Sequence, residues 1–190
     1  MELLERRILK DGKIRPGGIL KIDGFLNHRI DPELTHEMAL EIKRLFQDSG
    51  VNKVLTIEAS GIAMAVMAAY ELGCPLVFAK KSKTSNIADD VYAVQIASYT
   101  HGNVNTVLVS KEYLGEGDWV LIVDDFLATG SALIGLKALV EQAGAEVVGA
   151  AIAVEKEFQG GGNKLRAEGL RVESLAKVSY MDDEGNIRFC

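Results

Sequence analysis

Two adjacent carboxylates and a short run of small residues stand close enough together to bind one sugar phosphate. Asp124 and Asp125 are separated by two residues from the segment Ala128-Thr129-Gly130-Ser131-Ala132. Free backbone N–H groups at the start of a helix bind phosphate, and the hydroxyls of Thr129 and Ser131 can add donors. Neighbouring carboxylates can accept hydrogen bonds from sugar hydroxyls or hold a hydrated Mg²⁺. The spacing therefore predicts a site for a phosphorylated sugar.

The residues on either side predict the elements that position this site. Residues 119–123 form an apolar run rich in β-branched side chains, which is typical of a central strand in a parallel sheet. Residues 133–143 keep helical apolar spacing until Gly144. We expect the two aspartates where the strand ends and the small residues in the loop before the helix. Either feature alone is common in proteins, but the ordered combination is much more specific.

A second unit of the same kind precedes it. Residues 54–57 predict a buried strand, residues 62–72 a helix closed by Gly73, and the loop between them is Glu58-Ala59-Ser60-Gly61. Two such loops meet where neighbouring parallel strands send their connections in opposite directions. A third strand, residues 76–79, leads into the basic segment that begins Lys80-Lys81. Positive charge on this edge of an acidic protein suits a phosphate substrate.

The stretch from residue 121 to 132 resembles the signature of the type I phosphoribosyltransferases: an apolar run, two acids, two apolar residues and a small Thr/Gly/Ser loop. One departure is Phe126, where most members carry an aliphatic residue. The resemblance implies that the 128–132 loop binds the 5-phosphate of phosphoribosyl pyrophosphate. It also implies that the catalytic acids Asp124 and Asp125 lie along the ribose hydroxyls. The 58–61 loop would then bind pyrophosphate through its backbone, with Lys81 beside it.

For the fold we expect one α/β domain, residues 1–190, with three layers (α/β/α) around a mainly parallel sheet. The strand at 147–154 follows the 119–123 strand after one helix, so the two should be neighbours and Lys156 should lie on the rim of the site. The resemblance adds a purine-binding hood, to which about residues 1–35 contribute, and a flexible flap at about 82–110. Within the flap, residues 91–99 and 106–110 predict a hairpin. Near the C-terminus we expect an exposed loop at 160–162, a helix at 164–168, a strand at 171–178, and a turn before a polar tail.

The resemblance covers essentially the whole chain and is closest to the bacterial xanthine phosphoribosyltransferases, over residues 20–28, 56–63, 123–128, 154–156 and 171–176. It implies transfer of the phosphoribosyl group to N9 of xanthine, giving xanthosine monophosphate and pyrophosphate. Mg²⁺ would arrive with phosphoribosyl pyrophosphate, without a permanent metal site on the protein. The positions implied to bind the purine are Leu20, Asn27 and Lys156.

The chemistry of these three side chains agrees with a 6-oxopurine. Lysine donates hydrogen bonds and accepts none, so Lys156 would pair with a 6-oxo group and leave the amino group of adenine unmatched. Asn27 can donate its amide to the 2-oxo group of xanthine, or flip and accept from guanine. A guanine/hypoxanthine phosphoribosyltransferase is therefore an alternative. A non-enzymatic regulator of the same fold that senses phosphoribosyl pyrophosphate is another.

The composition of the chain limits which binding partners and which cellular location we expect. The 190 residues carry a net charge of −6 with no basic run long enough for a dedicated nucleic-acid binder. About 50 residues precede the first predicted central strand, which are too few for a separate DNA-binding domain. Cys74 and Cys190 match no metal or redox-motif spacing, and no apolar run approaches the ~20 residues of a membrane span. We expect a soluble, cytoplasmic protein and, from the resemblance, a homodimer.

Overall fold

The computed structural model describes residues 1–81, 90–97 and 104–190. Its helical elements are α1 (Glu2–Asp11), the π-helical turn η1 (Asp23–Asn27), α2 (Pro32–Phe46), α3 (Ile62–Leu72), α4 (Ser131–Gln142), the 3-10 turn η2 (Glu157–Gln159) and α5 (Gly161–Ala167). Its strands are β1 (Lys13–Arg15), β2 (Ile19–Lys21), β3 (Lys53–Ile57), β4 (Leu76–Ala79), β5 (Val91–Ala97), β6 (Val104–Ser110), β7 (Trp119–Leu127), β8 (Glu146–Lys156), β9 (Val172–Met181) and β10 (Ile187–Phe189).

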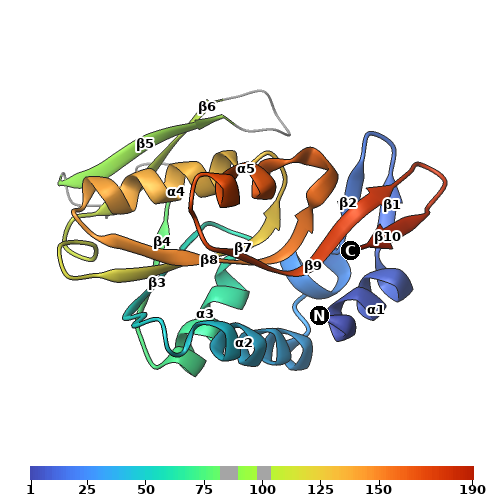
Figure 1. Ribbon diagram of the computed structural model, residues 1–190, viewed down its shortest axis with the longest axis horizontal. Coiled ribbons are helices and arrows are strands. Elements are labelled where there is room, and N and C mark those ends of the chain that lie inside the picture. Colours follow the sequence, from blue (N-terminus) through green and yellow to red (C-terminus); the bar gives the residue numbers. More distant parts are fainter. Residues whose placement is uncertain (82–89, 98–103) are drawn as a thin grey trace.

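A six-stranded sheet forms the middle layer, with strand order β10-β9-β8-β7-β3-β4. All neighbouring pairs are parallel except β10 with β9. Helices α2 and α3 cover one face, α4 and α5 cover the other, and the β5–β6 hairpin lies outside α4 (Figure 1). The expected three-layer α/β/α fold with a mainly parallel sheet is confirmed.

Strand β7 divides its side chains between two apolar cores. Leu121 and Val123 belong to the cluster on the side of α2 and α3. Val120 and Ile122 belong to the cluster on the side of α4. A strand that is buried on both faces must be apolar at consecutive positions, which explains why the run from residue 119 to 123 has no alternation.

The point at which the connections reverse lies between β3 and β7. These strands are parallel neighbours, and β3 continues through α3 to β4 on one side, whereas β7 continues through α4 to β8 on the other. The loops that follow them therefore open at the same edge of the sheet, as the sequence predicts. In parallel α/β sheets this crevice is the usual ligand site.

One predicted boundary in this region is wrong in an informative way. Strand β7 does not end before the aspartates but continues to Leu127, because β8 runs alongside it as far as the pair Leu127 and Glu155. Strand β3, on the other side, pairs with β7 only as far as Ile122. The aspartates therefore lie on a strand that is hydrogen-bonded on one side and open on the other.

Other differences concern short elements. The predicted polar tail contains β10, which pairs antiparallel with β9, and β9 itself extends to Met181. A small β1–β2 hairpin precedes η1. The predicted exposed loop at 160–162 is wrong, since Gly161 and Gly162 are buried and begin α5. Glycine is required at both positions because any Cβ would overlap Ala128 or Glu155, respectively.

The hairpin predicted within the flap is present as β5 and β6, paired from Val91–Ser110 to Ala97–Val104. Residues 82–89 and 98–103, which include parts of the expected flap, lie outside the described residues, so flap mobility stays a prediction. No helix in the described part of the chain is long and apolar enough to cross a membrane.

Candidate active site

A cavity opens at the edge of the sheet where β3 and β7 diverge. It is lined by Ile57, Glu58, Ser60, Lys81, Ile96, Asn105, Val107 and residues 124–133. The structure thus brings together most of the predicted sugar-phosphate residues, from three separate segments of the chain. Of the predicted set, Ala59 and Gly61 belong to the same turn as Glu58 but do not line the cavity, and the predicted purine residues do not line it either.

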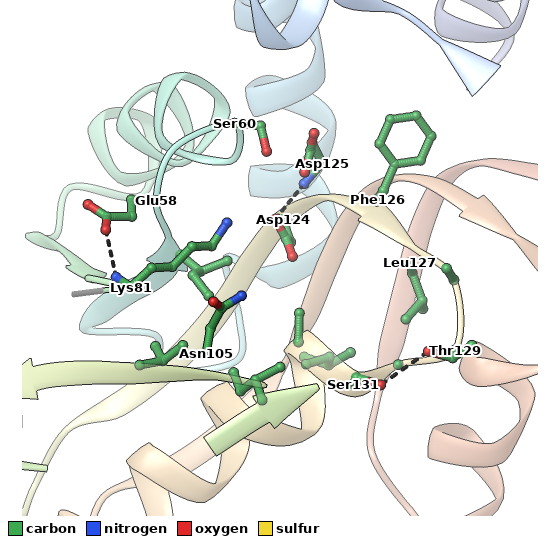
Figure 2. A pocket seen from close by; sticks show the side chains of 17 residues that line it. Glu58, Ser60, Lys81, Asn105, Asp124, Asp125, Phe126, Leu127, Thr129 and Ser131 are labelled. Carbon is green, nitrogen blue, oxygen red and sulfur yellow. Dashed lines mark hydrogen bonds between the residues drawn. The ribbon is translucent and has the colours of Figure 1, made fainter. Parts of the chain in front are cut away.

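The loop after β7 has the geometry of an anion site. Gly130 adopts φ 89°, a left-handed conformation that favours glycine, and immediately precedes α4. The hydroxyls of Thr129 and Ser131 lie 3.1 Å apart at the mouth of the loop (Figure 2). The helix that begins here has 12 residues, so its unpaired amino-terminal N–H groups and dipole favour a bound anion.

The loop after β3 places a second set of groups opposite. The peptide bond between Glu58 and Ala59 is cis. The Glu58 carboxylate accepts a 2.6 Å hydrogen bond from the backbone N–H of Lys81, and the Lys81 side chain extends into the cavity towards Asp124 (Figure 2). A lysine that is held at its backbone can direct its ammonium group at a bound anion.

Close packing at this turn leaves no room for a side chain at residue 61. A Cβ on Gly61 would lie 2.4 Å from the Thr56 hydroxyl and 3.0 Å from a carboxylate oxygen of Asp124. The 58–61 turn therefore touches the acidic pair directly, although Gly61 is behind the cavity wall.

The acidic pair is buried, with 6% of Asp124 and 7% of Asp125 exposed. The Asp125 N–H donates to Asp124 Oδ1 at 2.9 Å. Burial raises the pKa of Asp124 well above its usual range, and the negative charge of Asp125 raises it further. Two acids held in this way, near the ammonium group of Lys81, form a rigid acceptor for ligand hydroxyls.

The three predicted purine residues lie around Phe126 and Asp125. Asn27, the last residue of η1, donates its amide to Asp125 Oδ2 at 3.0 Å. The Lys156 ammonium group donates to the Gly18 carbonyl at 2.9 Å and lies 5.6 Å from the centroid of the Phe126 ring. Burial lowers the pKa of Lys156. Leu20 is buried in the apolar cluster against which Phe126 packs.

Sequence reasoning missed several residues of the cavity, notably Phe126, Asn105 and Ile96. The sequence did draw attention to Phe126, because most type I phosphoribosyltransferases carry an aliphatic residue at this position. Asn105 and Ile96 gave none, because they face each other on β6 and β5, outside any motif. Their hairpin can lie flat on α4 because Gly135 has no Cβ, which would be 2.2 Å from Ile96.

Comparison with known proteins agrees with this geometry. The phosphoribosyl transferase domain family matches residues 33–166. The chain is 52% identical over 183 residues to a xanthine phosphoribosyltransferase of Lactobacillus delbrueckii subsp. bulgaricus, with 96% of this chain and 97% of that protein covered. It is 47% identical over 189 residues to a xanthine phosphoribosyltransferase of Bacillus cereus, with 100% of this chain and 95% of that protein covered.

Among solved structures, the adenine phosphoribosyltransferase of Rhodothermus marinus has the same fold. It superposes with a TM-score of 0.74 at 24% identity, covering 93% of this chain and 99% of that one. The domain match, the near-full-length relatives and the shared fold lead to one conclusion: the chain belongs to the phosphoribosyl transferase domain family.

Proposed function

We propose that the chain transfers the 5-phosphoribosyl group from phosphoribosyl pyrophosphate to N9 of xanthine, releasing xanthosine monophosphate and pyrophosphate in purine salvage. The observation that carries the proposal is the convergence of two loops with anion-binding character on one cavity, with the buried acidic pair between them. Relatives about half identical over nearly the full length, named for xanthine, support the choice of base.

In this proposal the substrate lies across the edge of the sheet. Residues 128–132 bind the 5-phosphate, and Asp124 and Asp125 accept hydrogen bonds from the ribose hydroxyls. The 58–61 turn and Lys81 bind the pyrophosphate group. Holding both phosphate ends and the ribose fixes the anomeric carbon for attack by N9, so catalysis comes mainly from positioning and charge stabilisation.

Mg²⁺ would arrive with phosphoribosyl pyrophosphate and, when bound, would supply positive charge to the pyrophosphate group. The described residues contain no group of three or more His, Cys, Asp or Glu side chains suited to a metal. Asp124 and Asp125 provide carboxylate oxygens of the kind that Mg²⁺ prefers, and substrate oxygens and water would complete the shell.

The purine is proposed to bind beside Phe126. Lys156 would exchange its bond to the Gly18 carbonyl for one to the 6-oxo group of the base. Asn27, already 3.0 Å from Asp125, would donate to the 2-oxo group of xanthine. Leu20 completes the apolar side. The hydrogen bond from Asn27 to Asp125 supports a base site directly next to the ribose site.

Initial rates with xanthine, guanine and hypoxanthine, each with phosphoribosyl pyrophosphate and Mg²⁺, test the proposal. We expect kcat/KM for the base, measured by pyrophosphate release, to be highest with xanthine. A faster reaction with guanine or hypoxanthine would replace xanthine by the alternative base. Binding of phosphoribosyl pyrophosphate by calorimetry without turnover of any base, together with a gel shift of DNA, would indicate a regulator instead.

The homodimer and the cytoplasmic location are parts of the same proposal. Both cysteines are free, which suits a reducing compartment. Sedimentation equilibrium measures the oligomeric state, and a single species with the mass of one chain would contradict the dimer.

A further inference from the structure

The short helix α5 packs directly against the back of the 128–132 loop. The N–H of Gly161 donates to the carbonyl of Ala128 at 3.2 Å. A Cβ on Gly161 would lie 2.3 Å from that same carbonyl oxygen and 2.7 Å from the N of Gly130. The buried side chain of Leu165 supports Gly130 from the same helix. Figure 1 shows α5 beside the amino-terminal end of α4, where this loop ends.

A buried ion pair holds α5 in this position. Arg166 of α5 donates to both carboxylate oxygens of Glu155, at 2.8 and 2.6 Å, and its Nε donates to the Val172 carbonyl at 3.0 Å. The hydroxyl of Ser174 donates to the same carboxylate at 2.5 Å. Only 1% of the Glu155 side chain is exposed. Gly162 permits this closeness, since a Cβ there would lie 1.9 Å from Glu155 Oε1.

Glu155 is itself anchored next to the loop. In the register of the sheet it lies opposite Leu127, the residue immediately before Ala128. A two-point Arg–carboxylate contact restrains orientation as well as distance, which a single hydrogen bond does not. A chain of fixed contacts therefore runs from β8 through Arg166 and Gly161 to the backbone of the loop.

From this arrangement we infer that Glu155 and Arg166 are positioning residues that set the affinity of the enzyme for the 5-phosphate of its substrate. They do not touch the phosphate; they hold α5, and α5 holds the backbone N–H groups of the loop in place. A buried ion pair often adds little to the stability of a fold, so the contribution expected from this pair is to the geometry of the loop. The inference rests on the proposed function of the 128–132 loop.

The double variant Glu155→Gln/Arg166→Gln tests the inference, because it removes both charges without leaving one of them unpaired. We expect the Kd for ribose 5-phosphate and the KM for phosphoribosyl pyrophosphate to rise on the order of tenfold, as when supporting contacts of a bound group are lost. The KM for xanthine should change less than about twofold, since the backbone of Lys156 is held by the pairing of β8 with β9 and its side chain by the Gly18 carbonyl.

The matched control is Lys53→Gln/Asp118→Asn, which neutralises another partly buried ion pair, with an Nζ–Oδ2 distance of 2.6 Å, at the opposite edge of the sheet. It should lower Tm without changing the KM for phosphoribosyl pyrophosphate.

Equal loss of affinity for both substrates, or an unchanged Kd for ribose 5-phosphate, would overturn the inference. Should the Glu155/Arg166 double variant not fold, Arg166→Lys keeps the charge but loses the two-point contact, and a wild-type Kd there would overturn it too. If wild type binds no phosphoribosyl pyrophosphate, it is the proposed function that fails.

Discussion

Replacing Asp125 with asparagine should lower turnover while leaving the folded state at least as stable as wild type. The side chain is 7% exposed, and asparagine keeps its shape and an oxygen that can still accept from Asn27. The change removes one of two adjacent buried negative charges. Because the charge of Asp125 contributes to the raised pKa of Asp124, its removal relieves a repulsion within the folded protein.

The expected loss of activity follows from the hydrogen bonds that the ribose would make. A hydrogen bond to a charged acceptor contributes about 1.5–3 kcal/mol, against about 0.5–1.5 kcal/mol for a neutral one. The difference is about 1–1.5 kcal/mol for each bond, so two ribose hydroxyls that donate to Asp125 would lose about 2–3 kcal/mol. Since about 1.4 kcal/mol corresponds to tenfold, kcat/KM for phosphoribosyl pyrophosphate should fall by about 30-fold to about 140-fold.

Steady-state pyrophosphate release and thermal unfolding of the same preparation measure the two effects. Asp183→Asn, in the exposed turn between β9 and β10, makes the same change of charge away from the cavity and should leave both quantities unchanged. Near-normal kcat/KM in Asp125→Asn would remove the pair from the ribose site. A fall in Tm would refute the claim that repulsion between the two acids destabilises the fold.

Three further changes test other parts of the site. Lys156→Gln introduces a hydrogen-bond acceptor next to the base, so the ratio of kcat/KM for xanthine to kcat/KM for adenine should fall on the order of tenfold or more. An unchanged purine preference in initial rates would contradict the proposed role of Lys156. Gly61→Ala places a Cβ 2.4 Å from the Thr56 hydroxyl, so the unfolding free energy should drop by about 1–3 kcal/mol and the KM for phosphoribosyl pyrophosphate should rise, whereas Gly24→Ala, in open space, should alter neither. The folded-state pKa of Asp124 is raised, so the contribution of this group to stability is fully present below its unfolded pKa and is lost as pH rises through the folded pKa. Asp124→Asn should lessen that loss, and urea unfolding at several pH values would refute this if both proteins lost stability in parallel.

The elements that carry the two anion loops were predictable because each has a strong local signal. The apolar run at 119–123 must be buried on both faces, and Gly73 and Gly144 end the helices with φ of 70° and 69°, conformations that favour glycine. Opposite connections from neighbouring strands then bring the loops to one edge. The local sequence pattern and the direction of the connections were together enough to predict that the two loops of the cavity meet at one edge of the sheet.

What could not be predicted depends on contacts between distant segments. Strand β10 has three residues and gains its structure only by pairing with β9, so it has no periodicity of its own. The glycines at 161 and 162 indicate that side chains are excluded, but not that Ala128 and Glu155 fill the space. Asn105 reaches the cavity only because its hairpin folds over α4, which no spacing in the sequence reveals.

The site itself arises from a mismatch between the two neighbours of β7. Strand β3 stops pairing at Ile122, which opens the side of the aspartates that faces the 58–61 turn. Strand β8 continues to Lys156, which keeps Asp124 and Phe126 in an extended backbone by hydrogen bonds from the other side. A strand that is hydrogen-bonded on one side only is held in place and is also accessible from its open side. The proposed binding of a ribose by the buried acidic pair needs both properties. The same extension of β8 brings Glu155 to the back of the 128–132 loop, the proposed phosphate site, and Lys156 to the proposed purine side, so one strand would position groups for both ends of the substrate.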